Sequence, residues 1–245
     1  QFYLLNHNTL FGLFGPKYTN KYFAQTMQQY FGDLTVSQLL KPCLIPSYDL
    51  ASRKAIIVNS MTGKKDAYRD YKLRDAVLAS CSAPTYFPPT CSNLDGVCPD
   101  CLIDGGVFAN NPSICALVEA MKLPEARKLN DTILFSLGNA STTKSYPYKK
   151  VKRWGIAQYA VPLIDVLMDS SEEVVDYQLR KLYSIIDAED NYIRIEAVRT
   201  DHIPSMDDVS KEGITRLQKI GDDLVNETDM KIKDTAKRLI KNRHK

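Results

Sequence analysis

The sequence predicts an α/β protein, a layered α/β/α fold with a mostly parallel central sheet. Short runs rich in β-branched residues alternate along the chain with longer segments whose apolar residues recur at helical spacing. Three of the four short runs are nearly continuous in apolar residues, as strands covered on both faces are. No internal repeat and no low-complexity linker interrupts the 245 residues, so one domain over residues 1–245 is expected.

The individual elements follow from these patterns. Strands are predicted at 54–60, 101–105, 131–139 and 191–198. Helices are predicted at 21–31, 71–80, 112–122, 165–186 and 208–226. The helix at 112–122 has the clearest limits, because Asn111 is a good N-cap, Pro112 suits the first turn and Pro124 lies just beyond the end.

The C-terminal segment is basic and is predicted as a terminal helix over 228–245. Residues 230–245 carry seven Lys and Arg against one Asp, so the other residues sum to −3 within a net charge of +3. Such a segment can meet phosphates on lipid or nucleic acid. It can also be a solvated helix that packs on the body through an apolar stripe of Ile232, Ala236, Leu239 and Ile240.

Composition and motifs exclude several classes of protein. The content of 44% hydrophobic and 25% charged residues is ordinary for a globular protein, and no apolar run is long enough to span a bilayer as a helix. There is no phosphate-binding loop, dinucleotide fingerprint, H-E-x-x-H or RNA-binding aromatic signature. No cofactor, no metal and no nucleic-acid partner is therefore expected. The start lacks both Met and a signal peptide, so Gln1 is expected to be an internal position of a longer protein.

Six cysteines leave three interpretations open. Cys91, Cys98 and Cys101 cluster in "CSNLDGVCPDC", and the last two have C-x-x-C spacing. A zinc site lacks an obvious fourth ligand nearby, a loop disulfide is possible, and ordinary thiols fit a chain of this length. The thiols favour a reducing interior.

The segment "CLIDGGVFANNPSICALVEAM" at 101–121 holds the best candidate for chemistry. Asp104 comes directly after an apolar strand, where open α/β sheets place ligand-binding groups. Gly105 and Gly106 allow a sharp turn and leave room for another group to approach the carboxylate. A plain turn in which Asp104 caps backbone amides fits the same residues.

Four segments, in order, decide between these interpretations. "LIDGGVFANNPSICALVEA" resembles the D-G-G/A region of patatin-like phospholipases, as found in bacterial members. "GDLTVSQLLKPCLIPSYDL", "YKLRDAVLASCSAPTYFPP" and "ILFSLGN" are similar to further segments of that family, with Asn139 and Ala140 where Thr and Gly are usual. "NYIRIEA" fits its late strand.

The resemblance implies a lipid acyl hydrolase of phospholipase A or lysophospholipase type that works with a Ser–Asp dyad. In it Asp104 is the catalytic base, Gly105 and Gly106 are the motif glycines, and lipid at a membrane surface is the substrate. The family's G-x-S-x-G elbow and oxyanion loop are not in this sequence, so the fold is expected to be incomplete at its N-terminus. The N-terminal remainder of the same protein is then a partner, and the chain alone should not hydrolyse esters.

Three alternatives accompany this hypothesis. Ser136 has Leu134 where an elbow needs glycine and is interpreted as structural, whereas His202 as a base would need a serine elbow that is absent. The aromatic segments 84–90 and 10–18 can line an acyl-chain entry or anchor loops. A degenerate patatin-like module that binds membranes or a partner protein is the other function considered. A cytoplasmic or peripheral membrane location is expected, and export into a host cell is not readable from the sequence.

Overall fold

The computed structural model describes residues 15–91, 100–123, 128–142, 145–159, 162–199 and 203–242. The chain forms two compact units, which are described separately. Unit 1 comprises residues 1–126 and 155–181, and unit 2 comprises residues 127–154 and 182–245. Helices and strands are both present, and this confirms the α/β class. The single domain over residues 1–245 stays a prediction.

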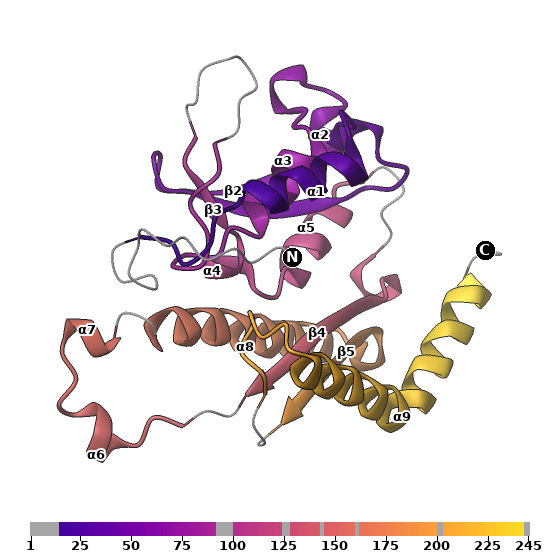
Figure 1. The fold of residues 1–245 in the computed structure, drawn as a ribbon. Helices are drawn as coiled ribbons and strands as arrows, with labels where there is room; N and C mark the ends of the chain where they lie inside the picture. Colours follow the sequence, from indigo (N-terminus) through magenta and orange to yellow (C-terminus); the bar gives the residue numbers. More distant parts are fainter. Residues whose placement is uncertain are drawn as a thin grey trace. The chain divides into compact units, whose positions relative to one another are not determined.

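Unit 1 is built on a three-stranded sheet of order β2-β1-β3 (Figure 1). The strands are β1 (Leu44–Asp49), β2 (Lys54–Asn59) and β3 (Leu102–Asp104). Both pairings are antiparallel. The predicted strands at 54–60 and 101–105 are therefore present, whereas β1 was not predicted. Its apolar run is broken by Pro46, Ser47 and Asp49, so the pattern does not predict a strand. The two polar side chains are accommodated because each forms hydrogen bonds to the backbone.

Helices surround this sheet within unit 1. Helix α1 (Lys21–Phe31) packs on α3 (Leu73–Ser80), and α3 packs on β1. A small core of Val36, Val58, Leu73 and Ala76 holds them together. The other helices of this unit are α2 (Ser60–Gly63), α4 (Gly106–Ala109), α5 (Ser113–Ala120), α7 (Ile156–Tyr159) and the first part of α8 (Pro162–Ile185).

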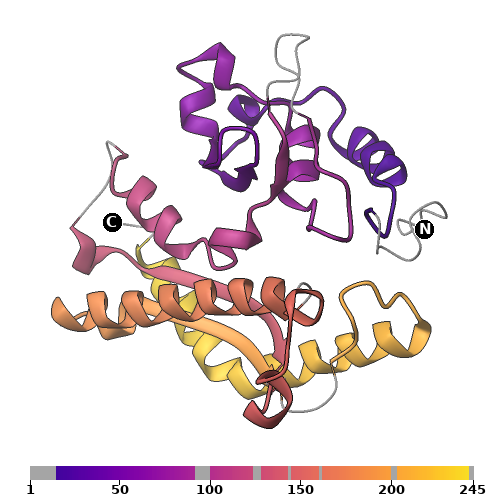
Figure 2. The same cartoon turned by 90° about the vertical axis from the view of Figure 1, so that its left-hand side faces the viewer.

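Unit 2 contains a parallel pair of strands, β4 (Leu134–Thr142) and β5 (Tyr192–Arg199). Figure 2 shows helix α9 (Lys211–Asn242) lying along this pair, and α9 contacts β5. The Tyr183 ring is fully buried and stacks on Tyr192 with ring centroids 6.0 Å apart. Short helix α6 (Tyr148–Val151) belongs to the same unit. Four 3-10 turns complete the described chain: Val36–Gln38 and Ala67–Arg69 in unit 1, Leu129–Asp131 and Glu189–Asn191 in unit 2.

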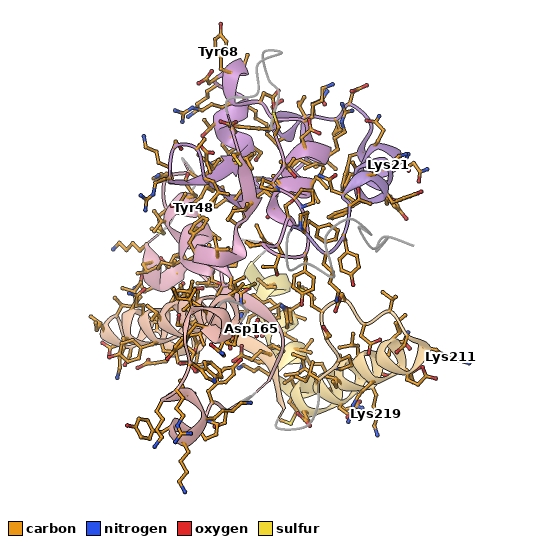
Figure 3. All side chains as sticks on the ribbon, turned by 60° about the vertical axis from the view of Figure 1, so that its left-hand side comes forward. Lys21, Tyr48, Tyr68, Asp165, Lys211 and Lys219 are labelled. Carbon is orange, nitrogen blue, oxygen red and sulfur yellow. The ribbon has the colours of Figure 1, made fainter. Side chains whose placement is uncertain are left out.

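Two details of the predicted architecture are corrected. Among the described strands two of the three pairings are antiparallel. The apolar pattern reveals neither the short hairpin turn that joins β1 to β2 nor the distant pairing of β1 with β3. The segments 208–226 and 228–245 are not separate helices, since α9 runs unbroken from Lys211 to Asn242. Figure 3 shows Lys211 and Lys219 pointing outward from this helix.

The expected packing stripe at the end of α9 is also wrong. Leu239 and Ile240 are 51% and 63% exposed, whereas Thr235 is buried at 5%. The Thr235 hydroxyl donates to the Lys231 carbonyl at 2.7 Å, which lets a polar residue face the body of unit 2.

Candidate active site around Asp104

Asp104 is the last residue of β3 and lies opposite Ser47 in the pairing with β1. Its backbone N–H donates to the Ser82 carbonyl at 3.0 Å, so it is tied to the turn after α3 as well as to the sheet. Leu102 and Ile103, the preceding residues, are buried. The strand is short, and its apolar residues anchor it while the carboxylate is left at its end.

One oxygen of the Asp104 carboxylate is held by the protein. Oδ1 accepts a hydrogen bond from the Gly106 N–H at 2.7 Å, and no described residue donates to Oδ2. Burial raises the pKa of Asp104, and the hydrogen bond from Gly106 offsets part of that effect. A carboxylate with one fixed oxygen and a raised pKa is suited to accept a proton at its other oxygen.

The two glycines are needed for space rather than for an unusual backbone conformation. Gly105 has φ −69°, which any residue adopts. A Cβ on Gly105 would lie 2.3 Å from the carbonyl oxygen of Pro46, a backbone atom that cannot step aside. A Cβ on Gly106 would lie 2.9 Å from the end of the Met168 side chain and 3.1 Å from Oδ1 of Asp104. Both glycines are therefore required by close neighbours, and Gly105 is the stricter requirement, whereas room for another group beside the carboxylate stays a prediction.

Hydroxyl groups near Asp104 have other partners. Ser47 is buried and its Oγ donates to the Ile103 carbonyl at 2.7 Å. Ser82 is buried too, and its Oγ bonds to the Leu78 carbonyl and to Oγ1 of Thr90. The part of the chain that the structure describes contains no hydroxyl hydrogen-bonded to the Asp104 carboxylate.

A free thiol also lies near this carboxylate. Burial, and after it the charge of Asp104, raises the pKa of the Cys81 thiol. The thiol is therefore kept neutral, and a neutral thiol is a poor nucleophile.

The residues after Asp104 connect the site to two helices. Asn110 at the end of α4 donates through Nδ2 to Oε2 of Glu172 on α8 at 2.7 Å. Buried Asn111 accepts from the Ser113 N–H at 3.1 Å, so its side chain binds the first turn of α5 although Pro112 occupies the N-cap position. The predicted N-cap position is therefore wrong by one residue, although the Asn111 side chain does accept a hydrogen bond from the first turn of α5.

Asp49, which sequence reasoning missed, fixes the register of β1 against β3. Its carboxylate accepts hydrogen bonds from the N–H groups of Ala51, Ser52 and Cys101. Burial acts to raise its pKa, but these bonds and the one from the Ser52 hydroxyl outweigh burial and lower it. The only sequence signal is an acidic residue just before a turn.

Ser136 lies in unit 2 and is structural, as predicted. It is buried on β4, and Nη1 of Arg194 donates to its Oγ at 2.8 Å. Arg194 also donates through Nε and Nη2 to Oε2 of Glu196. A Cβ on Gly138 would lie 2.3 Å from Nη2 of Arg194, so this glycine makes room for the guanidinium.

Several residues singled out in the sequence lie outside the described chain, and the structure decides between the interpretations of Cys91. His202, Cys98 and residues 10–14 lie outside the described residues. Cys91 is disulfide-bonded, which matches the loop-disulfide alternative. The other described cysteines, Cys43, Cys81, Cys101 and Cys115, are free. A disulfide is more typical of an oxidising compartment than of the reducing interior that the thiols suggested.

The aromatic segment 84–90 anchors a loop. Phe87 is buried, and its ring contacts those of Tyr18 and Phe23 at 5.9 and 5.8 Å between centroids. Backbone bonds from Lys17 and Tyr18 to this segment hold it in place. The structure favours anchoring over an acyl-chain entry here.

None of the helices among the described residues is both long and apolar enough to cross a membrane. Nor do the described residues bring three or more His, Cys, Asp or Glu side chains together as a metal site.

Comparisons with known proteins agree with the pattern around Asp104. Residues 2–114 match the family described as "Patatin-like phospholipase". The chain is 29% identical to Patatin-like protein 1 of Arabidopsis thaliana over 242 residues, covering 90% of this chain and 58% of that protein. It is 29% identical to Patatin-T5 of Solanum tuberosum over 235 residues, covering 88% and 61%.

A further relative qualifies what the similarity implies. The chain is 30% identical to Solanum tuberosum "Probable inactive patatin-3-Kuras 1" over 236 residues, covering 89% of this chain and 63% of that protein. The chain thus spans about three fifths of the length of these curated relatives. They are plant proteins and lend no support to a bacterial type. Similarity over nearly the whole chain shows that it belongs to the patatin-like phospholipase family.

Proposed function

We propose that the protein containing this chain is a lipid acyl hydrolase in which Asp104 is the general base of a Ser–Asp dyad. The carrying observation is the Asp104 carboxylate, with Oδ1 fixed by the Gly106 N–H, Oδ2 without a donor from the described residues, and a pKa raised by burial. Family membership supports the substrate class, a carboxylic ester of a lipid.

The proposed chemistry makes Asp104 the proton acceptor in both halves of the reaction. A serine hydroxyl attacks the ester carbonyl while Asp104 takes its proton, and the alcohol leaves with that proton as an acyl-enzyme forms. Water then attacks the acyl group with Asp104 again as base, and the bond to the serine oxygen breaks as that oxygen recovers the proton and the fatty acid leaves. The serine and the N–H groups that stabilise the oxyanion are assigned to no residue of this chain, because the sequence has no G-x-S-x-G elbow and no described hydroxyl is hydrogen-bonded to the Asp104 carboxylate.

The test uses the whole protein and measures release of fatty acid from phospholipid and lysophospholipid. Asp104→Asn keeps the size of the side chain and an oxygen for the Gly106 N–H but removes the base, so kcat should fall about 10²-fold to 10⁴-fold. Asp131→Asn, at an exposed acidic residue of unit 2, is the matched control. Equal rates for the two variants would show that Asp104 is not the base.

A second candidate is a catalytically degenerate module that binds membranes or a partner protein. The name of the "Probable inactive" relative and the absence of a hydroxyl bonded to Asp104 among the described residues favour it. Under this alternative the whole protein releases no fatty acid above background, and Asp104→Asn changes nothing, although vesicle binding persists.

A further inference from the structure

Unit 2 carries a basic segment that neither the fold nor the Asp104 site explains. No Asp or Glu occurs between Asp131 and Asp165. Within this stretch four cations stand close together at Lys149, Lys150, Lys152 and Arg153. All four side chains are exposed. A concentration of one charge over so short a length creates a local positive potential, although the whole chain is only +3.

Aromatic residues give this segment a defined shape. Tyr146 and Trp154, both half-buried, flank α6 and meet edge to face with ring centroids 5.3 Å apart. Between them, Pro147 leads into α6 and Tyr148 is 79% exposed. Lys152 Nζ lies 6.0 Å from the Tyr148 ring centroid. The aromatic pair joins the two ends of the loop, and the cations and Tyr148 project from it.

The cations here differ from those of the basic terminal helix. On α9, Lys231 Nζ donates to the Arg194 carbonyl, Arg238 Nη1 donates to the Asp190 carbonyl, and Lys233 pairs with Asp229. None of the four cations at 149–153 forms a salt bridge with a carboxylate in the described part of the chain. The described residues therefore do not neutralise their charge with a carboxylate.

We propose that residues 146–154 form a docking surface for an anionic lipid bilayer. A cluster of Lys and Arg is attracted to the negative surface potential of anionic lipids. Tyr and Trp side chains, with an apolar ring and a polar tip, fit the headgroup layer of a bilayer. The choice of a lipid bilayer over another polyanion rests on the proposed function. The positive charge and the exposure of residues 149–153 are independent of that function.

The test measures binding of the 245-residue chain to vesicles that it cannot hydrolyse. Vesicles are made from ether-linked phosphatidylglycerol and phosphatidylcholine, or from the ether-linked phosphatidylcholine alone, and bound protein is sedimented. Because ether lipids contain no ester, binding is independent of catalysis, and the outcome is separate from that of the Asp104→Asn assay. Binding should require phosphatidylglycerol and weaken as salt is raised from about 0.1 M to about 1 M.

A charge-matched pair of variants locates the surface. The first replaces Lys149, Lys150, Lys152 and Arg153 with Gln and should weaken partitioning by at least about tenfold. The control replaces four exposed lysines of unit 1, Lys41, Lys54, Lys64 and Lys65, with Gln and should keep most of the binding. Both lose the same net charge, and far-UV circular dichroism verifies that both remain folded.

The chain's one tryptophan provides a local readout of the same event. Trp154 emission should shift to the blue on adding anionic vesicles, and brominated lipid should quench it in the wild-type chain but not in the four-Gln variant. Equal vesicle binding by the two variants, no binding at low salt, or no response of Trp154 would each overturn the proposal. The proposal would also be overturned if the chain bound a single-stranded RNA oligonucleotide more tightly than vesicles and the four-Gln variant lost that binding. The partner would then be a nucleic acid.

Discussion

The N–H of Gly106 and Oδ1 of Asp104 are joined by a 2.7 Å hydrogen bond across two residues of one turn. This bond orients the carboxylate from its own backbone, and no side chain of the described residues donates to it. The neighbouring Gly105 keeps that turn against β1, where its Cα faces the Pro46 carbonyl. The orientation of Asp104 therefore depends on two glycines for different reasons.

Alanine at these two glycines should have unequal effects on stability. Gly105→Ala places a Cβ against the Pro46 carbonyl oxygen and should lower the free energy of unfolding by about 3 kcal/mol or prevent folding. Gly106→Ala meets mainly the flexible end of Met168 and should cost about 1 kcal/mol. Urea denaturation measures both.

A control for the alanine pair is Gly221→Ala on α9, where an added Cβ meets no atom within 4 Å. Alanine should there stabilise the chain by up to about 1 kcal/mol, since it is the better helix former. A Gly105→Ala variant as stable as Gly221→Ala would contradict the close approach to Pro46.

Asp104→Asn should raise stability at neutral pH. The folded state raises the pKa of Asp104 above its ordinary value of 3.8, so the charged form costs stability above the folded pKa and that cost disappears as pH falls through it. Each unit of raised pKa corresponds to about 1.4 kcal/mol. Chemical denaturation of both proteins from pH 7 to pH 4 should show the difference shrinking towards acid pH. A stability difference that widens towards acid pH would show that the folded state does not raise the pKa of Asp104.

Asp49→Asn should destabilise the chain by about 1–3 kcal/mol at pH 7, because it weakens hydrogen bonds from Ala51, Ser52 and Cys101 at a buried position. The folded pKa of Asp49 is lowered below 3.8, so its contribution is complete above that value and is lost as pH falls through the folded pKa. Denaturation midpoints followed from pH 6 down to pH 2 check this. Equal acid sensitivity in the variant and in wild type would argue against a stabilising contribution from the Asp49 carboxylate.

Arg194→Met should destabilise unit 2 by about 3–5 kcal/mol, since the Arg194 side chain is 3% exposed and its loss strands the Glu196 carboxylate and removes a hydrogen bond to the Ser136 hydroxyl. Replacing Glu196 by Gln in the same chain removes the stranded charge and should recover part of the loss. A double variant no more stable than Arg194→Met would show that the ion pair is not the reason. Thermal melting followed by circular dichroism distinguishes these outcomes.

The sequence predicts the strands that local composition encodes. β2, β4 and β5 are present because their β-branched runs need only a buried surface, and Asp104 is correctly expected at the end of β3. β1 was missed because the strand is held partly by Ser47 and Asp49, polar residues that resemble a loop in sequence. Strand direction was misjudged because pairing partners such as Tyr48 and Ile103 are far apart in the chain.

Burial on α9 shows a second limit of pattern reasoning. Ile240 was expected to pack, yet Thr235 faces the body of unit 2 instead. Periodicity locates an apolar stripe but not the surface that will receive it, and a threonine that bonds its own helix can be buried at little cost. The helix itself was predictable, whereas its orientation was not.

Ser47 and Asp49 act on Asp104 from more than 50 positions away in the chain. They clamp β1 to the strand that ends in the carboxylate, the first through the Ile103 carbonyl and the second through the Cys101 N–H. If Asp104 acts as the proposed base, a saturation mutagenesis screen for ester hydrolysis should show tolerance dropping sharply at 47 and 49 as well as at 104–106. An engineer altering substrate range would do best to leave this upstream clamp intact and to vary the helix faces around it.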